Sequence, residues 1–332
     1  MIKKILIVLT AGLLLTLALV YALIEYQIRQ PLALEQNTLL TVEPGTHAGS
    51  FSRSLVKKGW LDTRFYLRNY IRLHPALAKL KAGTYQVEAG MSPLDLTHRL
   101  VQGKEHQFSV TFIEGSSFRQ WLALLASQPR LKQTLSKLSV KEIAARLSLD
   151  LENPEGWFFP ETYAYTAGTS DLVILQRAHK KMRQTLDSLW QQRPGGLPYQ
   201  SPYQALIMAS IIEKETRQLD EQPLIASVFI NRLDKGMRLQ TDPTVIYGLG
   251  ERYQGDIKRS HLREKTAYNT YRINGLPPTP IAMPGYSSLK AALNPASSDY
   301  LYFVSKGDGF HVFSKTLAEH NRAVGRYQLG RH

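Results

Sequence analysis

The stretch ALIMASIIEKET, Ala205–Thr216, decides how the second half of this chain folds. Its first eight residues are apolar or small on every side, which predicts a buried helix over residues 201–217. Glu213 continues the buried stripe at the C-terminal end of that helix, next to Leu206 and Ala209. At about 100° per residue, Glu215 points roughly 200° away and is expected to meet solvent or another domain. The two carboxyls are therefore not expected to form a side-by-side pair.

Two roles are open for Glu213. A partly buried carboxyl at the negative end of a helix is disfavoured as an anion, and a carboxyl that keeps its proton suits general acid catalysis. Arg217 stands four residues further on, and ion pairs with this spacing commonly decorate helix ends. The four-residue spacing alone therefore favours a structural role for Glu213, in an ion pair with Arg217.

The composition of the 332-residue chain is that of a globular protein with room for two or three domains, since 43% of residues are hydrophobic and 20% charged. The formal net charge of +14 suits an acidic partner such as nucleic acid, an anionic membrane surface or an acidic polymer. The chain has no cysteine, which excludes disulfides and thiolate chemistry.

The N-terminal residues help to choose among these acidic partners. Lys3 and Lys4 precede an uncharged run over residues 5–24, which is long enough to cross a membrane. The positive-inside rule places the N-terminus in the cytoplasm and the remaining chain outside. A cleaved signal peptide is the alternative, but the run is long and Val20–Ala22 is a poor cleavage site. We therefore predict a single membrane anchor, an extracytoplasmic body and no nucleic-acid partner.

The rest of the chain mixes strands and helices, which predicts an α+β fold. Three segments combine a β-rich run, a Glu near a Gly turn and an amphipathic helix; they cover residues 39–58, 83–101 and 108–126. Their uneven spacing argues against a repeat array. Further on, residues 300–305 and 310–313 flank the turn sequence KGDG and predict a hairpin, followed by a last helix over residues 316–327.

The segment ASIIEKET, Ala209–Thr216, resembles the signature of the endolytic murein transglycosylases, the MltG (YceG-like) family. The likeness continues in order through EGWFFPETY (155–163), LQTDPTV (239–245), YNTY (268–271), GLPPTPI (275–281) and FVSKGDGFHVF (303–313). It covers nearly the whole chain and includes the single N-terminal membrane span.

The resemblance implies an organisation and a location. The anchor is residues 1–24, a linker follows over 25–37, and a LysM-like α+β module spans residues 38–104. A larger α+β catalytic domain covers residues 105–330, with its core at 201–330. The expected location is the cell inner (plasma) membrane, with the N-terminus cytoplasmic and the catalytic domain extracytoplasmic.

The resemblance also implies cleavage of the bond between N-acetylmuramic acid and N-acetylglucosamine inside peptidoglycan strands. Glu213 would be the catalytic acid and base, with the muramic C6 hydroxyl as nucleophile, so that no second carboxyl is needed. Products would carry 1,6-anhydro ends, and nascent strands would stop growing. Expected partners are glycan strands, the inner membrane and, as a candidate, peptidoglycan synthases.

Residue types predict the supporting roles. Side chains that can hydrogen-bond sugar hydroxyls or stack on sugar rings are assigned to substrate binding: Gln240, Asp242, Tyr268, Asn269 and Tyr271. Asp242 precedes Pro243, so capping of a helix is its alternative role. The histidines show no metal-ligand spacing, and no cofactor or metal is expected.

Two other functions stay open. A muramidase that uses water would need a base carboxylate roughly 6.5–9.5 Å from the acid, and Asp242 or Glu161 would be the first suspects. A glycan-binding scaffold of cell-wall synthesis would need no acid at all, and its function would survive Glu213→Gln.

Overall fold

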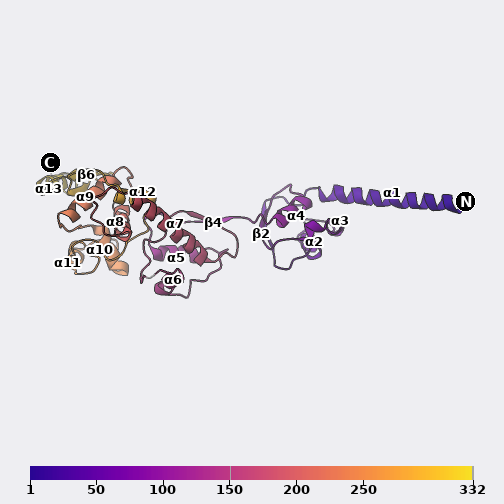
Figure 1. The fold of residues 1–332 in the computed structure, drawn as a ribbon, viewed down its shortest axis with the longest axis horizontal. Coiled ribbons are helices and arrows are strands. Elements are labelled where there is room, and N and C mark those ends of the chain that lie inside the picture. The colour runs from indigo at the N-terminus through magenta and orange to yellow at the C-terminus, as the bar shows by residue number, and fades with distance from the viewer. Residues whose placement is uncertain (150, 331–332) are drawn as a thin grey trace. The chain divides into compact units, whose positions relative to one another are not determined.

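The computed structural model describes residues 1–149 and 151–330, which form two compact units (Figure 1). Unit 1 comprises residues 1–108 and 164–168, and unit 2 comprises residues 109–163 and 169 onward. Each unit combines helices with a small antiparallel sheet, so the predicted α+β class is confirmed.

Unit 1 is a two-stranded sheet covered by short helices. Its elements are α1 (Ile2–Ile28), β1 (Thr38–Val42), α2 (Ala48–Lys57), α3 (Phe65–Leu73), a 3-10 helix (Pro75–Ala78), β2 (Gly83–Val87) and α4 (Pro93–Gln102). β1 runs antiparallel to β2, with Leu40 opposite Tyr85. Both side chains are buried in a core that α2, α3 and α4 complete.

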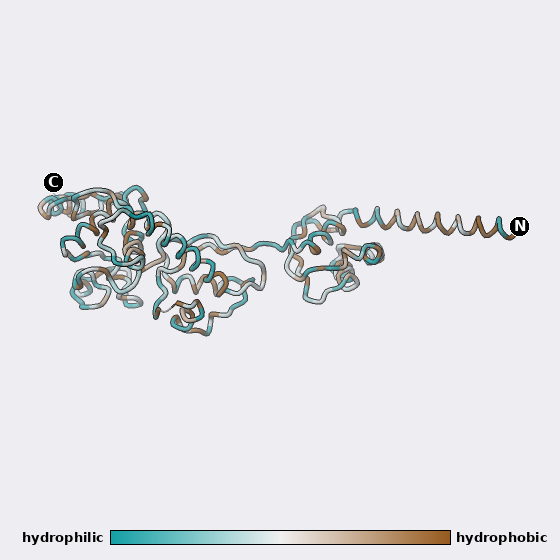
Figure 2. Tube along the Cα trace, in the orientation of Figure 1, coloured by the Kyte–Doolittle hydropathy of each residue, from teal (hydrophilic) through white to brown (hydrophobic). Residues whose placement is uncertain are grey.

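Helix α1 is long and apolar enough to cross a membrane by length and composition, and Figure 2 shows the hydrophobic colour along its turns. The helix runs beyond the predicted end at residue 24, so the linker predicted for residues 25–37 begins inside it. The reason is packing. Ile24, Ile28 and then Leu32 are buried in the core of unit 1, which makes the end of α1 part of that unit.

The remaining elements build the larger part of the chain. In order they are β3 (Phe108–Thr111), α5 (Phe118–Ala126), α6 (Val140–Arg146), β4 (Thr162–Tyr165), α7 (Asp171–Gln192), α8 (Pro202–Glu215), α9 (Gln222–Asp234), α10 (Asp242–Leu249), a 3-10 helix (Gly250–Arg252), α11 (Arg259–Arg263), α12 (Tyr286–Leu293), β5 (Tyr302–Ser305), β6 (His311–Ser314) and α13 (Leu317–Tyr327). β3 pairs with β4, and β5 with β6 as the predicted hairpin.

Helix α8 is the centre of unit 2. All residues from Ala205 to Ile212 are buried, as their apolar pattern predicts, and α9 and α12 pack against them. Pro202 starts the helix, where its missing N–H costs nothing. The helix ends at Glu215, because Thr216 is already extended. Arg217 therefore lies outside the helix, and no ion pair joins it to Glu213 among the residues that the structure describes.

The predicted strand–turn–helix segments form as expected, and serines start the second and third helices. Ser92 and Ser117 each accept a hydrogen bond from a backbone N–H one turn into α4 and α5. The short segment between β3 and α5 brings further side chains to the end of α8, and this meeting point forms the candidate site.

Candidate functional site

Glu213 sits at the last turn of α8 and is held by the start of α12. Its Oε2 accepts the backbone N–H of Gly285 at 3.0 Å and the hydroxyl of Ser288 at 2.7 Å. Among the described residues, Oε1 makes no hydrogen bond. One oxygen thus fixes the side chain, while the other stays available for a substrate.

The turn after β3 packs directly against this carboxyl. The Gly115 N–H donates to the carbonyl of Met283 at 2.9 Å, and the Met283 N–H returns to Ser116 at 2.9 Å. Gly115 has a positive φ of 71°, which a glycine adopts without strain. A Cβ at Gly115 would lie 3.6 Å from Glu213 Cγ, so even a small side chain would meet the carboxyl-bearing residue.

Glu114 brings a second carboxyl to the same place. Gly285 leaves room for it, because a Cβ at position 285 would overlap the Glu114 carboxyl. The N–H of this same glycine binds Glu213. Burial raises the pKa of Glu114, and the negative charge of Glu213 raises it further. Glu114 could not be singled out from the sequence, because its only signal, a Glu beside a Gly turn, recurs in all three strand–turn–helix segments.

These groups border a cavity of about 810 Å³. Its wall combines the turn after β3 with the end of α8 and the residues that follow, and includes Glu114, Gly115, Ser116, Gln120, Glu213, Lys214, Glu215, Arg217 and Gln222. Lys214 donates from Nζ to the Gly115 carbonyl at 3.1 Å, which ties the turn to the helix. A polar opening of this size is suited to a sugar chain.

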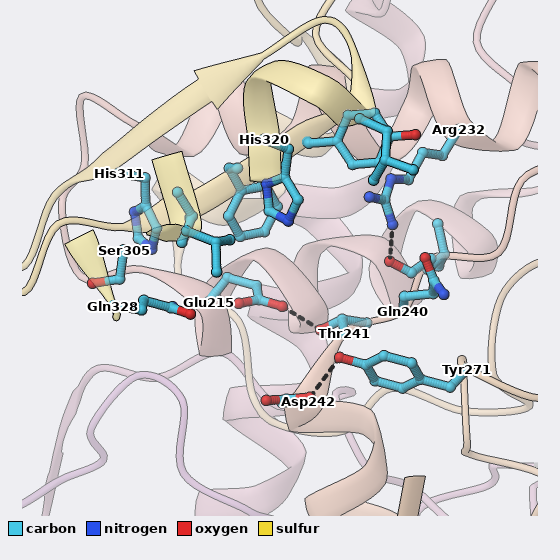
Figure 3. A pocket seen from close by; sticks show the side chains of 16 residues that line it. Glu215, Arg232, Gln240, Thr241, Asp242, Tyr271, Ser305, His311, His320 and Gln328 are labelled. Atoms are coloured by element: carbon cyan, nitrogen blue, oxygen red, sulfur yellow. Dashed lines mark hydrogen bonds between the residues drawn. The ribbon is translucent and has the colours of Figure 1, made fainter. Parts of the chain in front are cut away.

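Glu215 enters a second cavity, of about 490 Å³, shown in Figure 3. Its carboxyl accepts the Thr241 hydroxyl. Burial raises the pKa of Glu215 to about 7, against the opposing effect of the Thr241 hydrogen bond, and Asp242 adds to the rise. Glu215 was expected to meet solvent or another domain. It is half-buried and borders this cavity, and the segment containing Thr241 folds back over the end of α8 and supplies its hydrogen-bond partner.

Three of the predicted substrate-binding residues line this second cavity: Gln240, Asp242 and Tyr271. Tyr271 donates its hydroxyl to Asp242 Oδ1 at 2.7 Å (Figure 3). Asp242 is the first residue of α10, where a negative side chain favours the helix, while Thr241 holds the cap position. Arg232 closes the back of the cavity by donating to the Leu239 carbonyl at 2.8 Å.

Tyr268 and Asn269 do not line either cavity. Asn269 is buried, with 1% of its surface exposed, and its amide donates to the carbonyls of His261 at 3.1 Å and Glu264 at 2.7 Å. Its Oδ1 accepts the N–H of Tyr271 at 3.0 Å. The Tyr268 hydroxyl shares a hydrogen bond with Thr279 at 2.8 Å. In this structure, both side chains shape the loop that carries Tyr271.

Two further carboxyls have structural partners. Glu161, a suspected base of the muramidase alternative, forms an ion pair with Lys181 away from both cavities. Glu155 is buried and accepts the N–H of Phe118 at 2.9 Å, which caps α5, and the hydroxyl of Tyr247 at 3.2 Å. Burial raises the pKa of Glu155 to about 7.

The comparison with known proteins agrees with the motifs. The model of the YceG-like family matches residues 40–326, which is most of the chain. The chain belongs to the YceG-like family. The predicted family resemblance is therefore confirmed.

Relatives of this YceG-like chain carry the name of an enzyme. It is 32% identical over 305 residues to a protein of Bacillus subtilis named endolytic murein transglycosylase, covering 87% of this chain and 84% of that protein. A Streptococcus pneumoniae protein of the same name is 24% identical, over 91% of this chain and 61% of its own length. A crystal structure of a yceG-like protein from Listeria monocytogenes superimposes with a TM-score of 0.53 at 31% identity, covering 87% of this chain and all of that one.

Proposed function

We propose that this protein is an endolytic murein transglycosylase that cuts the bond between N-acetylmuramic acid and N-acetylglucosamine in peptidoglycan strands. The observation that carries the proposal is the setting of Glu213, which borders a large polar cavity and has one oxygen fixed by Gly285 and Ser288 while the other makes no hydrogen bond among the described residues. The names of the Bacillus subtilis and Streptococcus pneumoniae relatives support the substrate class.

Glu213 acts first as acid and then as base. Its proton passes to the glycosidic oxygen as the bond from that oxygen to C1 of the muramic sugar breaks. The C6 hydroxyl of the same sugar forms the new bond to C1, and its proton returns to the Glu213 carboxylate. No water is consumed, and the product carries a 1,6-anhydro end. Because the nucleophile belongs to the substrate, the reaction gains from proximity and needs no positioned water.

The hydrogen bonds around Glu213 suit this double role. Gly285 and Ser288 are both donors to Oε2, so they stabilise the carboxylate that forms when the proton leaves Oε1. They also keep the side chain in one position through both steps. Positioning within about 0.5 Å is what an acid–base residue requires.

Substrate binding extends to the neighbouring cavity. Glu215 borders both cavities, so the groups around Tyr271 and Asp242 adjoin the Glu213 side. Tyr271, Asp242 and Gln240 offer a hydroxyl, a carboxylate and an amide to sugar hydroxyls or N-acetyl groups, and sugars are recognised by such groups. We assign these three residues to glycan binding.

The N-terminal part of the chain bears on where in the cell the protein acts. We propose that α1 anchors the protein in the plasma membrane, with residues 38–104 as a LysM-like module and the catalytic domain outside the cytoplasm. Cutting close to the membrane would release nascent strands and end their elongation. The uncharged run of α1 and the lysines before it support this arrangement.

Digestion of purified peptidoglycan in water labelled with oxygen-18 tests the reaction. The transglycosylase should release fragments without label at their muramic ends, because C6 of the sugar supplies the oxygen. Label at every new end would establish hydrolysis instead.

Glu114 is the observation that favours a second function, a muramidase. A base or nucleophile carboxyl must lie close to the acid in such enzymes, and Glu114 borders the same cavity as Glu213. If the new ends carry oxygen-18 and Glu114→Gln stops their formation, Glu114 is that base and the transglycosylase assignment falls. Binding of glycan without any cleavage would point to a scaffold.

A further inference from the structure

The burial of its side chains defines where helix α1 leaves the membrane that it is proposed to cross and becomes part of unit 1. Its side chains are exposed through Leu23, and Ile24 is the first to be buried in unit 1. Residues 5–23 form a helical segment about 28 Å long, close to the thickness of a bilayer's hydrocarbon core of about 30 Å. Glu25 and Arg29, which form an ion pair at 3.0 Å, then lie at the headgroups.

Helix α3 packs beside this same part of α1 (Figure 1). Burial raises the pKa of the Tyr70 hydroxyl, and the nearby Glu25 carboxylate raises it further. Tyr70 and Ile71 also share one buried cluster with Ile24 and Ile28. Because these contacts fix α3 against residues 24–28, α3 lies at the level of the headgroups whenever α1 spans the bilayer.

The outer side of α3 is cationic and partly apolar. Arg64, Arg68 and Arg72 follow one another at intervals of four residues and are exposed, and none of them forms an ion pair among the described residues. Phe65 is 50% exposed and Leu73 58% exposed. Asp62 is the nearest acid in the sequence and lies before the helix. We call these five residues the α3 surface: Arg64, Phe65, Arg68, Arg72 and Leu73.

We propose that the α3 surface binds the anionic lipid headgroups of the bilayer that α1 crosses, a contact that rests on the proposed membrane anchoring. The arginines match the charge of phosphate headgroups, and apolar side chains beside them can enter the boundary between headgroups and acyl chains. Each arginine near an anionic surface favours the bound arrangement about fivefold. The contact would hold unit 1 against the membrane instead of leaving it free to swing on α1.

A single introduced cysteine can report this contact, because the chain has none of its own. The full-length protein is reconstituted in lipid nanodiscs with a polarity-sensitive fluorophore on Leu73→Cys. Nanodiscs of phosphatidylcholine alone are compared with nanodiscs that contain one quarter phosphatidylglycerol. A second protein, labelled at Leu14→Cys in the middle of α1, reports separately whether the anchor is in the bilayer.

Two triple variants provide the charge test. Arg64→Gln, Arg68→Gln and Arg72→Gln change the α3 surface, while Arg263→Gln, Arg272→Gln and Arg322→Gln remove three exposed charges from unit 2. Both lower the formal charge from +14 to +11, since each loses three arginines. Neither triple includes a residue assigned to catalysis or substrate binding, so glycan cleavage also checks their folding.

We expect the Leu73 label to move to a less polar environment only in anionic nanodiscs. The α3 triple and 1 M salt, which shortens the screening length to about 3 Å, should abolish the shift, and the unit 2 triple should keep it. A Leu73 label that stays in water while the Leu14 label is in hydrocarbon overturns this inference alone. A Leu14 label in water overturns the anchoring itself. A shift caused by soluble glycan fragments and not by anionic lipid would mean that the surface binds glycan, and would also overturn the inference.

Discussion

Glu213 and Glu215 stand two residues apart at the end of one helix, yet they have different environments. Glu213 is held through one oxygen by a backbone N–H and a serine hydroxyl, and it borders the larger cavity with Glu114 beside it. Glu215 borders both cavities, accepts the Thr241 hydroxyl and has a pKa raised to about 7 by burial. Position on the helix thus gives one carboxyl its hydrogen bonds from the start of α12 and the other its hydrogen bond from Thr241.

This contrast shows that a raised pKa does not by itself mark the catalytic acid. Glu155 also has a pKa raised to about 7 by burial, and it caps α5. Burial produces such shifts wherever a carboxyl is desolvated, whether or not a substrate reaches it. Glu155 lines neither cavity, so access to a cavity must be added to a raised pKa before a carboxyl becomes a candidate acid.

The largest expected effect comes from exchanging the two glutamates for glutamine, one at a time. Glu213→Gln should lower glycan cleavage by about 10³-fold, because it removes the acid and base while Gln can still accept from Gly285 and Ser288. Glu215→Gln should keep cleavage within about tenfold, because Gln resembles the protonated carboxyl that burial favours. Release of soluble fragments from purified peptidoglycan measures the activity of both variants. Equal losses of activity would contradict the assignment of different roles to Glu213 and Glu215.

The same Glu215→Gln variant should show its main effect in the pH dependence of stability. A carboxyl whose pKa rises from 4.5 to about 7 on folding stabilises the fold below pH 4.5, and this contribution is lost as the pH rises through about 7. The stability advantage of the wild type over the variant should therefore shrink by up to about 3 kcal/mol between pH 4.5 and 8. Urea unfolding at both pH values measures it, with Glu213→Gln as the matched control. A constant difference would mean that Glu215 is not desolvated.

Glu114→Gln tests whether the Glu114 and Glu213 carboxyls, which both border the larger cavity, act on each other. Burial and the charge of Glu213 raise the pKa of Glu114, so Glu114 is protonated at the acidic end of the profile. Because Gln resembles that protonated form, the substitution should change the alkaline limb of the activity profile more than the acidic limb. Initial rates across pH 5–9 provide the profile. Gln120→Ala changes the same cavity wall without changing charge and should leave the limb in place. An unchanged profile in Glu114→Gln would show that Glu114 is electrostatically silent.

The smallest effect is expected at Tyr271. Tyr271→Phe removes the hydroxyl that binds Asp242 at 2.7 Å but keeps the ring, so KM for glycan strands should rise severalfold with little change in kcat. Kinetics on soluble glycan strands of defined length give both constants. If kcat falls as steeply as in Glu213→Gln, the second cavity takes part in the chemistry and the contrast between the two sites is lost.

The sequence predicted what depends on local pattern. The apolar run of α8, the capped starts of α4 and α5 and the hairpin around KGDG all follow from residue order. The neighbours of Glu213 could not be predicted, because Glu114 and Ser288 come from segments about 100 and 75 residues away and meet it only through tertiary packing. For the same reason the hydrogen bond between Glu215 and Thr241 and the structural hydrogen bonds of Asn269 could not be predicted, since both depend on loops that fold back.

The most direct test of the account is mass spectrometry of the fragments that the full-length protein and its Glu213→Gln and Glu215→Gln variants release from purified peptidoglycan. We predict muramic ends that are one water lighter than hydrolysed ends, abundant with the wild type and with Glu215→Gln and absent with Glu213→Gln. Reducing ends from the wild type, or anhydro ends from Glu213→Gln, would contradict the central claim that Glu213 alone carries the proton in an intramolecular cleavage.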